Sequence, residues 1–349
     1  MAQLGKIISA LLIFFSLLYA QPHHIQFDHI TTKDGLSHNM VNAILKDSKG
    51  FMWFGTKDGL NRYDGYEFKV YKYDPQDSTS ISGNFITSIY EDREGMLWIG
   101  TNYTGFNKFN KKSNKFIRYK FDESLYPQSK INAINLFFED PADSIRVMWI
   151  GCGSALLKYI QDPKINIKNL ESKKKNSRLI KKISGRQGRF IHYHDNPADS
   201  NSISKMPWKN IIQDTWGRLW FGTPFGLNVL NKEMEIFTKY FHDPEDPNSI
   251  SSNIVLGVYE DEQGFIWVAT EGGGLNRFDP RSGTFARFQH DPNDPNSIGS
   301  DYVHDVYGDK KGQLWIVTAG GGFYQFDKCS ETFYCYKKEP AQHSRIGRH

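Results

Sequence analysis

One set of polar residues recurs at a fixed place in the sequence and could bind a ligand. Its members stand eight residues before an aspartate that opens a turn, and they are Asn39, Asn84, Asn132, Asn253 and Asp301. A carboxamide both donates and accepts hydrogen bonds, which suits a hydroxyl-rich ligand such as a sugar. The remaining copy has Met206 at this place, followed closely by Trp208, so that sector differs from the others. If the copies are arranged in a ring, this set, with Trp208, predicts a ligand site at one mouth of its central channel.

A second interpretation of the same residues is structural. Each asparagine follows a serine-rich turn, and an asparagine side chain in that place can cap the turn instead of meeting a ligand. Tyr103, Phe225 and Trp208 are candidate stacking platforms for a sugar ring, although single aromatic residues also serve in packing. The sequence leaves both interpretations open.

The sequence contains no recognisable motif for catalysis, metal binding or cofactor binding. The triple glycines 272–274 and 320–322 lie between two predicted strands, whereas a phosphate-binding loop precedes a helix. His192 and His194 share a strand face and could hold a metal or form a half-exposed pair. The aspartates of the DPEDPNSIS-like loops lack the dense spacing of a calcium loop. We therefore expect no enzymatic activity, no metal and no cofactor.

The polar residues belong to a repeated unit of sequence. A short tryptophan motif marks this unit six times. The motif reads WFGT, WIGT, WIGC, WFGT, WVAT and WIVT at Trp53, Trp98, Trp149, Trp220, Trp267 and Trp315. Successive copies start 45 to 71 residues apart, and most follow an Asp-x-x-Gly-x-x-Trp turn. A period in the forties with about four β-rich runs per unit is typical of β-propeller blades. We predict an all-β propeller with each tryptophan packed between neighbouring blades.

The predicted outer strands outnumber the complete units. Each tryptophan unit is followed by an aromatic outer strand, and residues 25–31, IQFDHIT, read as one more such strand before the first unit. The sequence thus predicts six visible four-stranded blades plus an orphan N-terminal outer strand, which is an incomplete seven-bladed ring within residues 21–338. An open ring leaves unpaired edges, so we expect a fragment of a longer protein or a chain that pairs with another piece.

Three segments fall outside the regular repeats. Residues 1–20 hold one lysine, a short apolar core and Ala20 before a polar start, which predicts a secretory signal peptide rather than a membrane anchor. A basic insertion at about residues 161–189 reads as a solvated loop or as a contact for an anionic partner. Residues 339–349 show no pattern and predict a disordered tail. We expect an exported, periplasmic protein.

Composition excludes further classes of protein. A net charge of +4 over 349 residues gives no basis for nucleic-acid binding. Three cysteines do not make a disulfide scaffold. Cys152 is expected to be a small buried residue, while Cys329 and Cys335 flank the last hairpin turn and could form a local bridge or stay free.

The repeats resemble a known family. The segments GFMWFGTKDGLNRYDGYEFKVY, GMLWIGT and GFIWVATEGGGLNRFD, with the opening ITTKDGLSHNMVNAILKDSKG, are similar to the regulator-propeller repeats of two-component sensors over roughly residues 25–338. In that family the periplasmic region usually holds two seven-bladed propellers and an immunoglobulin-like module, followed by a membrane span and a histidine kinase. The resemblance implies a sensor of oligosaccharides that switches on polysaccharide-utilisation genes. This sequence has six repeats without kinase motifs or a receiver, so kinase activity is implied only for a parent protein.

Two functions from different classes follow. The first is the periplasmic ligand-sensing propeller of a two-component system, carbohydrate-responsive and lacking its kinase. The second is a free-standing secreted propeller that binds a glycan or a protein without signalling. The expected partners are an oligosaccharide or other small ligand, together with further propeller and kinase segments of a parent protein or a homodimer partner. We expect membrane association only through a parent chain.

Overall fold

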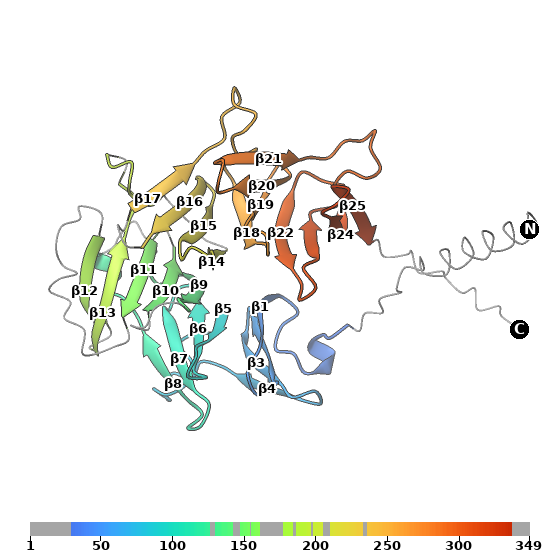
Figure 1. Cartoon of the computed structure of the whole chain (residues 1–349). Coiled ribbons are helices and arrows are strands. Elements are labelled where there is room, and N and C mark those ends of the chain that lie inside the picture. Colours follow the sequence, from blue (N-terminus) through green and yellow to red (C-terminus); the bar gives the residue numbers. More distant parts are fainter. Residues whose placement is uncertain are drawn as a thin grey trace, which may run out of the picture.

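The computed structural model describes residues 29–125, 130–141, 147–153, 155–160, 177–183, 186–196, 198–204, 210–232 and 236–336, without the side chains of 177–189. The predicted signal peptide and tail lie outside these residues. Within them the chain forms six antiparallel sheets that radiate from a common centre (Figure 1), which confirms the predicted all-β propeller. The sheets are called blades 1 to 6 in chain order.

Five blades hold four strands each, ordered from the centre outward as they occur in the chain. Blade 1 comprises β1 (Val41–Lys46), β2 (Met52–Thr56), β3 (Gly59–Tyr63) and β4 (Phe68–Tyr71). Blade 2 comprises β5 (Ile86–Glu91), β6 (Leu97–Thr101), β7 (Phe106–Asn110) and β8 (Lys115–Tyr119). Blade 4 comprises β14 (Ile211–Gln213), β15 (Leu219–Thr223), β16 (Gly226–Asn231) and β17 (Ile236–Tyr240). Blade 5 comprises β18 (Val255–Glu260), β19 (Ile266–Thr270), β20 (Leu275–Asp279) and β21 (Thr284–Phe288). Blade 6 comprises β22 (Val303–Gly308), β23 (Leu314–Thr318), β24 (Gly322–Asp327) and β25 (Thr332–Tyr336).

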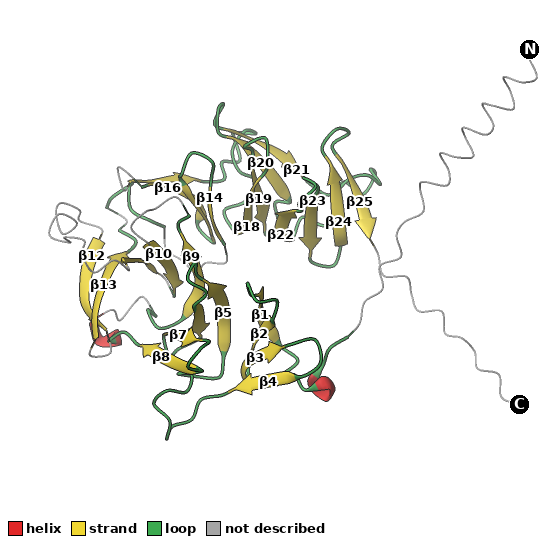
Figure 2. Ribbon diagram, turned by 60° about the horizontal axis from the view of Figure 1, so that its bottom comes forward, coloured by secondary structure: helices red, strands yellow, loops and turns green. Residues whose placement is uncertain are grey.

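Blade 3 has a fifth strand that the sequence did not predict. Its strands are β9 (Ile134–Glu139), β10 (Val147–Cys152), β11 (Ala155–Ile160), β12 (Ser177–Ile183) and β13 (Arg186–Tyr193), and β12 pairs outside β13. Part of the segment expected to be a solvated insertion therefore extends the sheet by one antiparallel strand. The two short 3-10 helices, η1 (Thr32–Asp34) and η2 (Glu123–Leu125), lie in loops before blades 1 and 3, and Figure 2 shows them in red.

The Asp-x-x-Gly-x-x-Trp motif forms the turn between the first two strands of a blade. In blade 1 one carboxylate oxygen of Asp47 accepts the N–H groups of Lys49 and Phe51, both at 3.0 Å. Gly50 has φ 91°, a conformation that favours glycine because it has no Cβ. The other carboxylate oxygen accepts the indole N–H of Trp53 at 2.9 Å. The same aspartate–tryptophan bond, at 2.8 to 3.1 Å, occurs in blades 2, 4, 5 and 6.

Five of the six motif tryptophans pack between blades, as predicted, whereas Trp315 is only partly buried and the ring contacts described for it, with Phe323 and Tyr336, lie within blade 6. Trp53, Trp98, Trp149, Trp220 and Trp267 are each at most 1% exposed. The ring of Trp53 meets Phe109 of blade 2 at 5.7 Å between centroids, and the ring of Trp220 meets Phe278 of blade 5 at 5.4 Å. Such edge contacts add to the apolar area that each ring buries. The core of the molecule is therefore divided among the blade interfaces rather than collected in one cluster.

The ends of the described chain meet the prediction only in part. Residues 25–28 of the predicted N-terminal outer strand lie outside the description, and residues 29–31 belong to no strand.

Cys152 is buried, and Cys329 and Cys335 are exposed and unbridged. Among the residues described, no helix is both long and apolar enough to cross a bilayer.

Candidate functional site: the central channel

A β-bulge changes the direction of one side chain on the innermost strand of most blades. In blade 1 the pairing of β1 with β2 passes from Val41 directly to Ala43, so Asn42 is an extra residue. The same irregularity sets apart the equivalent residues Thr87, Asn135, Leu256 and His304. A bulge bends a strand and re-aims the extra side chain. Here the bulges occur at one level of five innermost strands.

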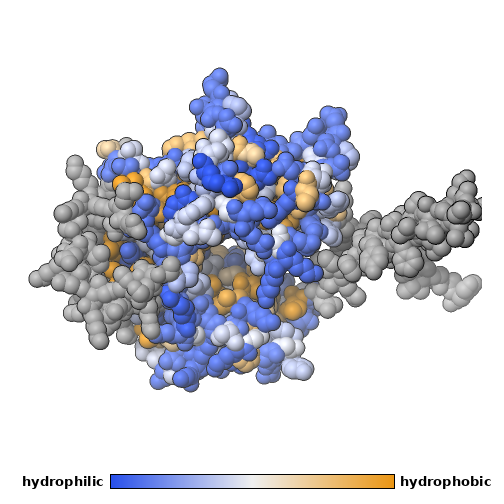
Figure 3. All heavy atoms as spheres, viewed as in Figure 1, coloured by the Kyte–Doolittle hydropathy of each residue, from blue (hydrophilic) through white to orange (hydrophobic). Residues whose placement is uncertain are grey.

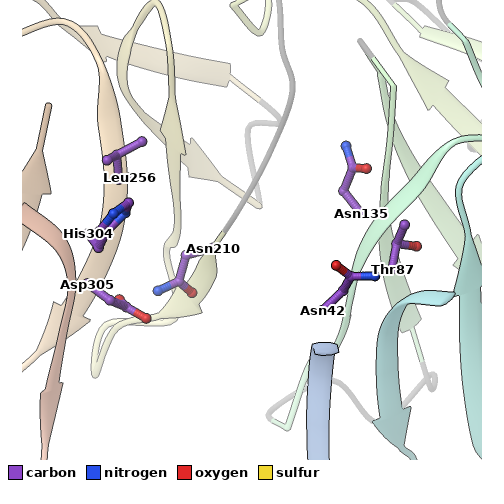
Figure 4. A pocket seen from close by; sticks show the side chains of 7 residues that line it. All are labelled: Asn42, Thr87, Asn135, Asn210, Leu256, His304 and Asp305. Atoms are coloured by element: carbon purple, nitrogen blue, oxygen red, sulfur yellow. The ribbon is translucent and has the colours of Figure 1, made fainter. Parts of the chain in front are cut away.

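These bulge residues line a cavity on the axis of the ring. The cavity has a volume of about 580 Å³, and its lining consists of Asn42, Thr87, Asn135, Asn210, Leu256, His304 and Asp305. Figure 4 shows Asn42, Thr87 and Asn135 on one side of the space, opposite Asn210, Leu256, His304 and Asp305. Figure 3, viewed as in Figure 1, shows a hollow near the middle of the molecule. The volume lies within the ordinary range of small-molecule sites.

Several lining side chains also tie one blade to the next. The Asn42 amide donates to the carbonyl of Ile86 in blade 2 at 2.8 Å, and the Asn210 amide donates to the carbonyl of Val258 in blade 5 at 2.9 Å. The Thr87 hydroxyl donates to the carbonyl of Ile134 in blade 3. These bonds occupy donors and hold each side chain in one orientation, leaving acceptor oxygens available to a ligand.

One sector of the channel carries ionisable groups. His304 and Asp305 are adjacent on β22 and both are exposed. The Asp305 carboxylate accepts the N–H of Val306 at 2.9 Å, and the His304 ring lies 4.9 Å from the Tyr302 ring between centroids. Across the cavity stand the neutral side chains of Asn42, Thr87 and Asn135 (Figure 4). The lining can therefore both donate and accept hydrogen bonds, which matches a ligand with several hydroxyl groups.

The residues predicted from the sequence hold the loops that enter the blades. The side chains of Asn84, Asn253 and Asp301 each accept, at 2.7 Å, a backbone N–H that lies eleven residues earlier. Asn132 accepts the N–H of Phe121 at 2.8 Å, and Asn39 accepts the N–H of Thr32 at 2.8 Å. Such bonds to loop N–H groups agree with the second interpretation, in which these side chains cap turns instead of meeting a ligand. The structure does not place these five among the residues that line the cavity, and Trp208 lies outside the described residues. Their role in binding stays a prediction.

Sequence reasoning missed the lining by three residues along the chain. Asn42, Thr87, Asn135 and His304 each stand three positions after a member of the predicted set. The predicted residues stand two positions before the innermost strands begin, so their side chains lie in the entry loops. The bulge residue that faces the channel follows inside the strand. The available signal was the recurrence of polar residues at this position, within an otherwise apolar strand.

Other candidates from the sequence do not assemble a site. Tyr103 and Phe225 are 64% and 50% exposed, at equivalent turns of blades 2 and 4, so both remain accessible to a ligand. The rings of His192 and His194 are stacked 5.6 Å apart. In the part of the chain that the structure describes, no group of three or more histidine, cysteine, aspartate or glutamate residues is arranged to hold a metal ion.

Comparison with known proteins relates the repeats to signalling proteins. The model for the two-component regulator propeller matches residues 35–58, 80–103 and 249–272, so these segments are two-component regulator propeller repeats. Histidine kinase P4 of Formosa agariphila is 49% identical over 65 residues, which are 19% of this chain and 5% of that protein. The chain thus spans a small fraction of this relative.

Solved structures show the same fold in proteins of different function. The extracellular domain of a hybrid two-component system from B. thetaiotaomicron superimposes with a TM-score of 0.66 at 24% identity, over 90% of this chain and 37% of that one. PorZ, a surface component of the type-IX secretion system of Porphyromonas gingivalis, gives a TM-score of 0.55 at 17% identity, over 80% and 37% of the two chains. A streptogramin B lyase gives 0.55 at 14% identity, over 87% and 85%. At these identities the likeness concerns the fold alone.

Proposed function

We propose that this chain is the extracytoplasmic, ligand-sensing propeller of a two-component system. The observation that carries the proposal is the match of three separate segments to the two-component regulator propeller, together with the 49% identical stretch in a histidine kinase. The relatives are larger proteins, so the kinase that would read the signal belongs to a parent chain or a partner. The periplasm is the compartment we propose, in keeping with the extracellular location of the structural neighbour from B. thetaiotaomicron.

The ligand that we propose is a neutral oligosaccharide bound in the central channel. Three amide side chains and one hydroxyl line the cavity, and Asn42, Thr87 and Asn210 are already fixed by bonds to the next blade. Such preorganisation lowers the entropic cost of binding. Because each of these bonds joins two blades, a ligand that shares the oxygens of these side chains would favour one spacing of the blades. A ligand can shift a conformational equilibrium only through such a difference in affinity.

Titration calorimetry of residues 21–349 with a panel of neutral and acidic oligosaccharides tests this proposal. We expect a neutral sugar to bind and Asn135→Leu to lower its affinity about tenfold or more, because losing one polar contact costs on the order of 1–3 kcal/mol. The matched control is Asn293→Leu, which makes the same change in an exposed outer loop. Equal affinity of both variants would place the site outside the channel. Binding without any effect on a co-expressed kinase reporter would instead support a secreted binding module.

A further inference from the structure

A pocket lies on the outer rim of the ring, between blades 4 and 5 and away from the central channel. It has a volume of about 470 Å³, which is within the ordinary range of small-molecule sites. Its walls come from the end of β17, from the loop that follows β17 up to residue 249, and from the turn and first residues of β21. Figure 1 shows β17 and β21 as outermost strands of their blades. We call this space the rim pocket.

The equivalent groove between blades 1 and 2 receives the side chain of Asn114. This asparagine is the fourth residue of the turn between the last two strands of blade 2, and its φ is 55°. Its side-chain oxygen accepts hydrogen bonds from the Tyr71 hydroxyl at 3.1 Å and from the Lys69 ammonium at 3.3 Å, both of blade 1. The carboxamide thereby joins the outer strands of two neighbouring blades.

The groove between blades 5 and 6 receives a different side chain from the same place in the turn. Glu331 is the fourth residue of the corresponding turn of blade 6, and its φ is also 55°. Its carboxylate pairs with Arg277 of blade 5 at 2.7 Å. In both grooves, a side-chain oxygen from this turn meets a donor of the preceding blade.

Gly283 is the fourth residue of this turn in blade 5 and has no side chain to place in the groove. Its φ is 74°, and a Cβ added to it would meet no atom within 4 Å. Blade 4 has Val229 opposite its motif tryptophan, where blade 5 has Arg277. The place that Asn114 and Glu331 take in the other grooves is therefore open between blades 4 and 5, beside the rim pocket that Gly283 lines.

Tyr240 has the same position and the same surroundings as Tyr71. Each ends the outer strand of its blade and pairs with the second residue of the third strand. Each ring stacks on the motif tryptophan of its own blade, at 6.2 Å for Tyr240 and 5.9 Å for Tyr71. Each also meets, edge-on at 5.7 Å, a phenylalanine in the outer strand of the next blade. Because the Tyr71 hydroxyl reaches Asn114, the Tyr240 hydroxyl is directed at the open place beside Gly283.

The rim pocket holds polar groups that the chain leaves unused. The Tyr240 hydroxyl has no hydrogen-bond partner among the described residues, and burial raises the pKa of Tyr240, so the hydroxyl stays protonated at neutral pH and can donate. Asp243 and Asp246 each accept, with one carboxylate oxygen, a backbone N–H two residues later, at 3.0 and 2.9 Å. Their other oxygens accept no hydrogen bond within the described chain. Phe241, which is 51% exposed, adds an apolar surface.

We propose that the rim pocket binds an N-acetylated sugar, whose acetamido oxygen accepts the Tyr240 hydroxyl as the Asn114 carboxamide accepts that of Tyr71. The acetamido group is an amide like the asparagine side chain, and the hydroxyl groups of the sugar match the free oxygens of Asp243 and Asp246. These two carboxylates repel an acidic ligand, so a neutral amide is favoured over a carboxylate. The rim pocket is separate from the central channel, and its ligand does not depend on the one proposed there.

Gly283→Asn closes the rim pocket and supplies the reference for a binding test. Asparagine tolerates a left-handed φ, as Asn114 does in blade 2, and its carboxamide should accept the Tyr240 hydroxyl. A ligand-observed NMR titration with N-acetylglucosamine compares residues 21–349 with this variant, so that any binding in the central channel cancels in the difference. We expect only the parent chain to bind at the rim, with a dissociation constant on the order of 1 mM for so small a ligand. No difference between the two proteins would overturn the proposal.

Two further comparisons test the amide contact itself. Tyr240→Phe removes only the hydroxyl and should weaken binding at the rim about threefold to tenfold, whereas Tyr71→Phe makes the same change in the occupied groove and should leave it unchanged. Glucose, which lacks the acetamido group, should bind at the rim at least about threefold more weakly than N-acetylglucosamine. Circular dichroism checks that each variant is folded. Equal binding of the two sugars, or equal binding by the two phenylalanine variants, would overturn the proposal.

Discussion

The indole nitrogen of Trp53 lies 2.9 Å from a carboxylate oxygen of Asp47, and Lys111 of blade 2 reaches the same oxygen at 2.9 Å. One buried carboxylate therefore closes the turn of its own blade, orients the tryptophan and joins the next blade. Burial by itself would raise the pKa of Asp47, but the hydrogen bonds from Lys111, Trp53 and the N–H of Phe51 outweigh it and lower the pKa. This residue is a point where local sequence and blade packing depend on each other.

Replacing Asp47 should cost more than replacing Asp309, its equivalent in blade 6. Asp47→Ala removes the acceptor of the Trp53 indole N–H and one of the two carboxylates that pair with Lys111, the other being that of Glu91. We expect a loss of about 1–3 kcal/mol in the free energy of unfolding. Asp309→Ala should cost about 1 kcal/mol or less, because Asp309 has no lysine from a neighbouring blade among the described residues. Urea unfolding followed by circular dichroism measures both. Similar losses would show that the contact between blades contributes nothing.

The glycine of the WxGT motif should be intolerant of a side chain only where a blade packs on it. Gly222→Ala places a Cβ 2.9 Å from Val255, and overpacking of this kind costs about 1–3 kcal/mol. Val317→Ala removes two methyl groups from an exposed face, so we expect less than about 0.5 kcal/mol. Thermal unfolding of the two variants decides the matter. A Gly222→Ala protein as stable as the parent would mean that the interface is looser than the structure shows.

The turn before Trp149 in blade 3 is longer than in the other blades, since its sequence reads EDPADSIRVMW. We therefore expect replacement of Trp149 to change the stability by a different amount from replacement of the other motif tryptophans. Trp149 is 1% exposed, and its indole nitrogen has no acceptor among the described residues, while Trp98 donates to Asp92 at 2.8 Å. Trp98→Phe loses a buried hydrogen bond that Trp149→Phe does not lose. We expect Trp98→Phe to be more destabilising by about 1 kcal/mol. Equal losses in chemical unfolding would show that Trp149 has an unseen acceptor, such as a water molecule.

Lys108 should make a contribution to stability that rises with pH on the alkaline side. Burial of the Lys108 ammonium, which lies 3.9 Å from the Trp98 ring centroid, lowers the pKa of Lys108 from 10.5 to about 8. Between these two values the unfolded chain binds more protons than the folded chain, so the free energy of unfolding increases with pH. Lys108→Met keeps the apolar stem and should remove this rise, which is on the order of 1 kcal/mol per pH unit.

Urea unfolding at about pH 7.5, 8.5 and 9.5 tests the prediction on both proteins. The window ends below the ordinary tyrosine pKa of about 10. Burial raises the pKa of Tyr159 to about 12 in the folded chain, so this residue removes stability as the pH rises above that ordinary value. The difference in unfolding free energy between parent and Lys108→Met should grow with pH in favour of the parent. Parallel curves would mean that Lys108 keeps an ordinary pKa.

Much of the fold follows from the sequence because its signals are local. The spacing of aspartate, glycine and tryptophan specifies a turn and the strand after it, and the turn at Asp47 and Gly50 has the expected form. Strand β12 was not predicted, because its sequence is basic and it pairs only through the edge of β13. An edge strand needs few apolar residues, so its pattern resembles that of a loop.

The sequence predicted which part of each repeat contributes to the candidate site, but not which residues line the channel. The sequence singled out Asn84 and Asn253, whose side chains hold entry loops, while Thr87 and Leu256 three residues later meet the channel. The difference arises because β5 and β18 begin only after Asn84 and Asn253, and a bulge inside each strand then turns Thr87 and Leu256 toward the channel. A bulge of this class has no fixed residue requirement, so a single sequence does not reveal it.

Hydrogen–deuterium exchange with the sugar identified by titration tests the central claim most directly. Each innermost strand of the blades pairs on one side only, so its channel-facing backbone groups are open to a ligand. We predict added protection in β1, β9 and β22, which carry Asn42, Asn135 and His304. Protection confined to the entry loops before the blades, or to the outer strands, would contradict a ligand site in the central channel.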